Sequence, residues 1–357
     1  MIQVNHAILH SFELEIGEKN LSSQELDLDN KKTKSFVSRH LRKAANNVEN
    51  NHGEFASDSG FADELSHYIV GHSDFIEFSQ QLADFFYTEL RKGDDATPCD
   101  LLVAEFTDTV SAGDVVVSEE AADQAFDGDL LRYFALLLLP RREIFVHSMS
   151  GYEGKTLAEI LRTDAALPNP TQKIDSYAVI NCDDMTVAFK DKPRTIAGMQ
   201  SYLIPDGLLR CSKEASSKET IEAVNIIVED IAEEYGLNTA VALSRAKAYV
   251  SENVDHEQAF NPQEVGRAVF QDAPEQIEKY EEKLSHKVET EAIPERVEVK
   301  KSQATRMVKN HKIKTDTGIE ITFPSEYASS AEFIEFSTDS DGLISIQLKN
   351  ITKIENR

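Results

Sequence analysis

The pattern of hydrophobic and polar positions predicts mixed strands and helices over residues 1–212. Positions 2–15 are strand-like, whereas positions 30–48 place their apolar side chains within one arc at 100° per residue, which indicates an amphipathic helix. A second helix is expected to begin at Ser73, as its N-cap, and to end at Arg91. This region therefore opens with a strand followed by two helices.

Short apolar runs predict further strands in the same region. They cover 101–106, 115–117, 133–139 and 144–147, and the runs 177–182 and 185–189 are typical of a hairpin around two aspartates. No phosphate-cradling Gly-rich loop follows any of these runs, and strands do not alternate regularly with helices. We therefore expect an α+β domain built on a largely antiparallel sheet, rather than a doubly wound one.

Residues 213–292 change to a helical pattern. Ser216 and Glu219 have the spacing of a capping box, and an apolar seam follows them. Three more helices are expected, which begin near 239, at Pro262 and at Pro274. The seam of the last helix, over 277–288, is compatible with a homodimer. Because residues 218–291 contain 7 basic and 17 acidic residues, this segment carries a net charge of −10.

Residues 293–357 return to strands and are expected to form a small β module. Positions 319–323 alternate strictly, and the runs 333–336 and 343–348 flank an Asp-Gly step that is typical of a hairpin turn. Gly318 is expected to form the turn between two earlier strands, because glycine tolerates a left-handed backbone.

The composition excludes several classes of protein. A length of 357 residues predicts two or three domains. The longest apolar run, 134–140, is far shorter than the ~20 residues that span a bilayer, and the N-terminus lacks the pattern of a signal peptide. Cys99, Cys182 and Cys211 form no CxxC motif and suit small core residues in a reducing cytosol. We expect a cytoplasmic protein with no membrane partner.

The chain is acidic overall, with 37 basic and 63 acidic residues and a net charge of −26, which repels nucleic acid at long range. Two segments are nevertheless basic. The first forms a stripe opposite the apolar arc of the 30–48 helix, with Lys34 at its edge, and the second joins the helical region to the β module. Their candidate DNA-binding residues are Lys31, Lys32, Arg39, Arg42 and Lys43, and then Arg296, Lys300, Lys301, Arg306, Lys309, Lys312 and Lys314. Such residues neutralise phosphates, although a solvated surface has the same composition.

Residues 94–131 show the opposite pattern, with eleven acidic residues and no Lys or Arg. This density is compatible with binding divalent cations, docking on a basic protein or imitating DNA. An ordinary solubilising surface has the same composition.

No pattern defines a catalytic or metal site. His6 and His10 share a strand face without a fixed third ligand, and no G-x-S-x-G elbow is present. The sharpest enzyme-like string is Glu298-Val299-Lys300, because a Glu-x-Lys pair can hold Mg²⁺ in nucleases. The sequence therefore predicts no catalytic residues, metal or cofactor, with a metal-dependent nuclease as the alternative.

Several stretches, taken in order, resemble one family. They are 165–175 (AALPNPTQKID), 177–181 (YAVIN), 312–324 (KIKTDTGIEITFP) and 341–351 (DGLISIQLKNI). Over nearly the whole chain, the sequence is similar to the bacterial nucleoid-associated protein family of the YejK (NdpA) type, particularly its Gram-positive members.

The resemblance implies a cytoplasmic protein found with the nucleoid, which binds DNA or acts with type II topoisomerases and has no defined catalytic site. Two accounts reconcile this role with the charge of −26. In one, the two basic segments bind the DNA backbone without reading sequence. In the other, the acidic surface docks on a basic DNA-handling enzyme such as a topoisomerase. An acidic decoy that occupies the DNA channel of that enzyme is a further alternative.

Overall fold

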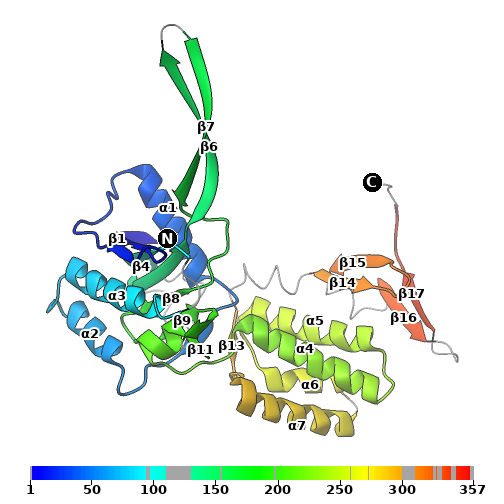
Figure 1. Cartoon of the computed structure of the whole chain (residues 1–357). Coiled ribbons are helices and arrows are strands. Elements are labelled where there is room, and N and C mark those ends of the chain that lie inside the picture. The colour runs from blue at the N-terminus through cyan, green and yellow to red at the C-terminus, as the bar shows by residue number, and fades with distance from the viewer. Residues whose placement is uncertain are drawn as a thin grey trace, which may run out of the picture. The chain divides into compact units, whose positions relative to one another are not determined.

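A seven-stranded sheet organises the first part of the chain (Figure 1). Its strands lie in the order β2-β1-β4-β5-β8-β9-β3, and every neighbouring pair is antiparallel. The expectation of an α+β fold on an antiparallel sheet is thus confirmed. The strands are β1 (Gln3–Glu13), β2 (Glu18–Asn20), β3 (Asn51–Gly53), β4 (Cys99–Thr109), β5 (Leu130–Pro140), β8 (Tyr177–Asn181) and β9 (Val187–Lys190).

The chain divides into two compact units, Met1–Lys213 and Glu214–Arg357, each treated separately below. The computed structural model describes residues 2–93, 97–109, 130–152, 155–196, 198–257, 259–271, 273–299, 310–324, 327, 332–338 and 343–353. Most of the acidic stretch, including the apolar run at 115–117, lies outside the described residues.

Helices cover both faces of the sheet. Helix α1 (Lys31–Ala45) packs on one face, and α2 (Gly60–Ile69), α3 (Phe75–Leu90) and the π-helical segment η2 (Leu203–Leu209) pack on the other. Successive residues of a central strand therefore enter different cores: Leu102 belongs to the α1 side and Val103 to the α3 side. This is why the middle of β4 (101–104) and of β5 (133–139) is continuously apolar, although antiparallel strands commonly alternate.

The structure corrects one helix start and adds one helix. The N-cap of α3 is Asp74 rather than Ser73, because the Asp74 carboxylate accepts hydrogen bonds from the backbone N–H groups of Ile76 and Glu77. Helix α2, capped by Ser59, was not predicted. Its ten residues make fewer than three turns, too few for a clear periodic signal.

Strands β6 (Arg142–Tyr152) and β7 (Lys155–Ala166) pair only with each other in the described part of the chain. They extend away from the large sheet as an isolated hairpin (Figure 1), called the arm below. The root of the arm is clamped. Arg141, between β5 and β6, ion-pairs with Glu13 at 2.5 Å and donates a hydrogen bond to the Phe12 carbonyl at 2.8 Å. A smaller hairpin, β10 (Pro193–Ile196) with β11 (Met199–Tyr202), lies nearer to η2.

The second unit contains a helical bundle. Its helices are α4 (Ser217–Glu234), α5 (Thr239–Glu257), α6 (Pro262–Phe270) and α7 (Pro274–Glu291), and β12 (Ala259–Phe260) pairs with β13 (Val297–Glu298). The capping box is confirmed, since the side chains and backbone N–H groups of Ser216 and Glu219 bond reciprocally. The 277–288 seam is not free for a partner. Tyr280 and Leu284 are buried in the bundle, and Val288 is its exposed end.

Two hairpins follow the bundle. Strand β14 (Asn310–Lys314) pairs with β15 (Glu320–Pro324), and β16 (Ile334–Thr338) pairs with β17 (Ile344–Leu348). Gly318 lies in the turn between β14 and β15 with φ +87°, which is the left-handed conformation expected for this glycine.

Candidate nucleic-acid interface

Helix α1 separates its apolar and basic residues onto opposite sides. Its buried residues are Val37, His40, Leu41 and Ala44, which pack on the sheet. The structure brings the first set of predicted residues together on the exposed side and adds Lys34, which the sequence placed only at the edge. The basic face, as it is called below, consists of Lys31, Lys32, Lys34, Arg39, Arg42 and Lys43.

Most of the basic face is electrostatically unpaired. Within the described residues, Lys31, Lys32, Lys34, Arg39 and Arg42 form no ion pair. The first turn of α1 contains no acidic residue and is capped by the neutral Asn30 side chain. Cations at this end oppose the helix dipole, which favours acids there. The three lysines therefore cost helix stability, a cost that an anionic partner would offset.

Lys43 differs from the rest of the basic face because it is bound to the protein itself. Its ammonium donates hydrogen bonds to the carbonyls of Thr171 and Gln172, at 2.9 and 2.5 Å. His40 Nε2 similarly bonds to the Pro168 carbonyl at 3.1 Å, and burial lowers the pKa of this histidine. The family-like stretch 165–175 is thus the segment that returns from the arm and docks on α1.

The second basic segment is less cationic than its sequence indicates. Arg296, Lys312 and Lys314 are exposed, but Lys312 ion-pairs with Glu320 at 2.8 Å, and Lys314 lies 4.0 Å from the same carboxylate. Glu320 lies beyond residues 296–314 in the sequence, and the register of β14 with β15 places it beside these lysines. Lys300, Lys301, Arg306 and Lys309 lie outside the described residues.

The histidines near β1 are held by structural contacts. Ser22 N–H donates to His10 Nδ1 at 3.1 Å, so Nε2 carries the proton and donates to Ser79 Oγ at 3.1 Å. Burial lowers the pKa of His10 to about 4. His6 instead contacts Glu25 at 3.0 Å. The two histidines of one strand therefore have separate partners and form no joint site.

The described residues contain no group of three or more His, Cys, Asp or Glu side chains placed to hold a metal ion. Glu298 lies in β13, opposite Ala259, and its side chain is exposed. Val299 is buried behind it, and Lys300 lies outside the described residues. In the described residues, Glu298 therefore belongs to a short two-stranded pairing, β12 with β13, beside the helical bundle.

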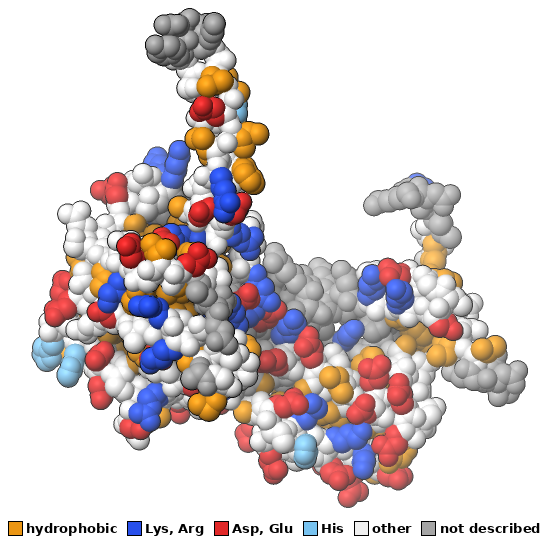
Figure 2. All heavy atoms as spheres, in the orientation of Figure 1, with side chains coloured by type: hydrophobic (Ala, Val, Ile, Leu, Met, Phe, Trp, Pro, Cys, Tyr) orange, Lys and Arg blue, Asp and Glu red, His pale blue; other side chains and the backbone are white. Residues whose placement is uncertain are grey.

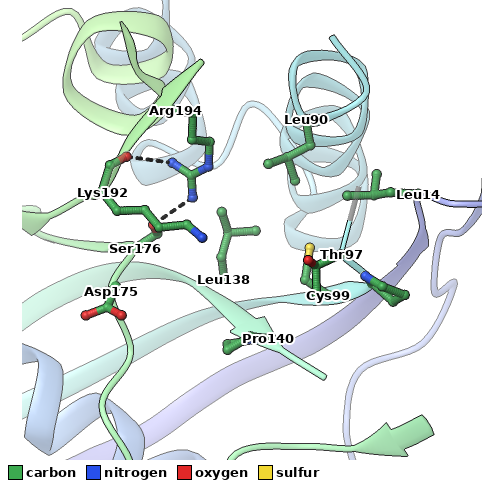
Figure 3. A pocket seen from close by; sticks show the side chains of 11 residues that line it. Leu14, Leu90, Thr97, Cys99, Leu138, Pro140, Asp175, Ser176, Lys192 and Arg194 are labelled. Carbon is green, nitrogen blue, oxygen red and sulfur yellow. Dashed lines mark hydrogen bonds between the residues drawn. The ribbon is translucent and has the colours of Figure 1, made fainter. Parts of the chain in front are cut away.

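A cavity of about 130 Å³ lies between the end of α3, the ends of β4 and β5, and β10 (Figure 3). Its floor is apolar, with Leu90 and Leu138, and Arg194 lines one wall. The guanidinium of Arg194 is already occupied, since it donates to the buried Asp191 carboxylate and to Ser176 Oγ, both at 2.7 Å. Asp191 also accepts the Ile204 N–H at 2.8 Å, so this network fixes η2.

A second buried ion pair, between Arg132 and Glu105, was also not predicted from the sequence. Glu105 accepts hydrogen bonds from Arg132 at 2.5 Å and from Tyr68 at 2.6 Å. Burial opposes ionisation of Glu105, but the hydrogen bonds from Arg132 and Tyr68 outweigh it and lower the pKa of this carboxyl. These hydrogen bonds tie α2, which carries Tyr68, to the sheet strands that carry Glu105 and Arg132.

The structure is therefore that of an α+β protein, with an antiparallel sheet covered by helices on both faces and an exposed basic face on α1. The chain belongs to the nucleoid-associated protein YejK family, whose model matches residues 8–354. A search of curated proteins found no match. In the described residues, no helix is long and apolar enough to cross a membrane.

Proposed function

We propose that this protein associates with the nucleoid by binding the DNA backbone without sequence preference, through the basic face of α1, and that it has no catalytic activity. The observation that carries the proposal is the set of five exposed cations with no ion pair in the described structure. Membership of a nucleoid-associated family supports it. A bare phosphate-binding surface suffices for such association.

The net charge of −26 is compatible with local binding. At physiological salt, interactions between exposed charges are largely screened beyond a Debye length of about 8–10 Å. DNA phosphates that contact α1 would therefore interact mainly with the cations of its basic face. The 15 residues of α1 span about 22 Å at ~1.5 Å per residue. Such a length can follow several successive phosphates along one strand.

Fluorescence anisotropy of a labelled duplex of ~30 base pairs, from about 25 to 200 mM salt, tests the proposal. The variant Arg39→Glu/Arg42→Glu should bind more than tenfold more weakly. Its log–log salt slope should be shallower by about 1.8, since each phosphate contact contributes about 0.9. Unchanged affinity and slope would contradict direct binding through α1.

The matched control is Arg91→Glu/Lys92→Glu, which changes the net charge equally. These exposed residues follow α3, on the opposite face of the sheet from α1. The control should retain the wild-type slope. Plasmid nicking with Mg²⁺ that disappears in Glu298→Ala would contradict a non-enzymatic role.

A second candidate function rests on the acidic helices of the second unit. Residues 218–291 carry a net charge of −10, and acidic side chains such as Glu222, Glu229 and Glu282 are exposed on α4 and α7. Such a surface would dock on a basic face of a type II topoisomerase. A salt-sensitive pull-down of topoisomerase subunits by the full chain, unaffected by Arg39→Glu/Arg42→Glu, would favour this role.

A further inference from the structure

The arm exposes an unusual amount of apolar surface. Its strands carry seven of the exposed large hydrophobic side chains of the described chain. Hydrophobic side chains are visible along the hairpin in Figure 2. Ile160 is 78% exposed and Phe145 is 68% exposed. The seven residues are Ile144, Phe145, Val146, Met149, Leu157, Ile160 and Leu161.

These side chains occupy both faces of the hairpin. In the antiparallel register, Val146 lies opposite Leu161 on one face, and His147 lies opposite Ile160 on the other, beside Phe145. A hairpin with one face toward a core and one toward water would be apolar on a single face only. An isolated two-stranded hairpin is at best marginally stable in water, so these faces need a cover.

The size of this surface matches an interface. At roughly 100 Å² for each side chain, the seven expose on the order of 700 Å² over the two faces together, so each face carries a patch of roughly 300–400 Å². A standard protein–protein interface takes about 800 Å² from each partner. With both faces covered, the arm would supply nearly one full side of such an interface.

The charge of the arm favours a second copy of the chain as the cover. Residues 142–166 contain three basic and four acidic residues, a net charge of −1 in a chain of −26. Near the root, Arg162 ion-pairs with Glu143 at 2.8 Å, so these charges neutralise each other. Two chains of −26 each repel at long range, and an arm with a net charge of −1 adds little to this repulsion, whereas a nucleic-acid partner would require a basic hairpin.

The geometry of the arm is also self-complementary. Its strands of 11 and 12 residues have free outer edges in the described structure. Identical strands related by a two-fold axis perpendicular to the sheet run antiparallel, which is a pairing that an open edge accepts. Edge pairing would supply the missing strand, whereas packing of one hairpin on the other would supply the matching apolar surface.

We propose that the arm is a homodimerisation element: the arms of two copies pack together about a two-fold axis and cover each other's apolar faces. This inference is independent of the DNA-binding role of α1. It replaces the 277–288 seam, which is largely buried in its own bundle, as the dimer surface.

Sedimentation velocity of the full chain at micromolar concentration tests this proposal. The wild type should sediment as a species of about 80 kDa, twice the 39.9 kDa of one chain. Phe145→Ser/Ile160→Ser, on one face, and Leu157→Ser/Leu161→Ser, on the other, should each shift the protein toward the monomer. Far-UV circular dichroism identifies any variant that fails to fold.

The control Met199→Ser/Ile226→Ser removes two exposed apolar side chains elsewhere and should stay dimeric. A monomeric wild type, or folded arm variants that remain dimeric, would overturn the proposal. A monomeric wild type whose arm variants lose DNA affinity would assign the arm to DNA instead.

Discussion

Strands β5 and β6 follow each other along the chain, and both are apolar on two faces, yet only β5 is covered. Phe134 of β5 is fully buried between the helix layers, whereas Phe145 of β6, eleven positions later, is 68% exposed. The clamp at Arg141 marks the point at which the chain leaves its own core. Hydrophobic patterning therefore shows that both faces of a strand need to be covered, but not whether the covering layers come from the same chain.

The largest expected effect comes from truncating the same residue type on the two strands. Phe134→Ala should destabilise the protein by about 3–5 kcal/mol, because it leaves a cavity in a packed core. Phe145→Ala should cost less than about 1 kcal/mol of intramolecular stability, since its site is largely solvated in one copy. Urea unfolding under monomeric conditions measures both. Equal losses would mean that the arm is covered within its own chain.

A smaller effect is the pH dependence of the free energy of unfolding, to which the buried His10 of the core contributes. Because the folded-state pKa of His10 is about 4, below its ordinary value of 6.5, the unfolded chain binds a proton first as the pH falls. The stability is fully present above pH 6.5 and decreases by about 3 kcal/mol as the pH falls to 4. Urea unfolding across this range should show that His10→Gln flattens this part of the profile. An unchanged profile would indicate that His10 titrates normally.

Much of the fold could be predicted because local signals and packing agree. The apolar runs of β4 and β5, the capping box at Ser216 and the glycine turn at Gly318 each lie where the sequence placed them. Strand β7 was not predicted. Its sequence, KTLAEILRTDAA, is rich in residues that favour helices, and pairing with β6 overrides that local preference.

The candidate site was predictable only in part. The basic face of α1 follows from helical periodicity alone, so its five predicted residues were found together. The neutralisation of Lys312 by Glu320 depends on strand register, and the docking of Lys43 on Thr171 joins positions 128 residues apart. Neither contact leaves a periodic signal in the sequence.

Amide hydrogen exchange tests most directly whether the uncovered strand is completed by a second copy. It compares the wild type with Phe145→Ser/Ile160→Ser at micromolar concentration and reports β5 and the arm in one experiment. We expect equal, strong protection of β5 in both proteins, and protection of the arm in the wild type that is lost in the variant. An arm that exchanges equally fast in both proteins would contradict it.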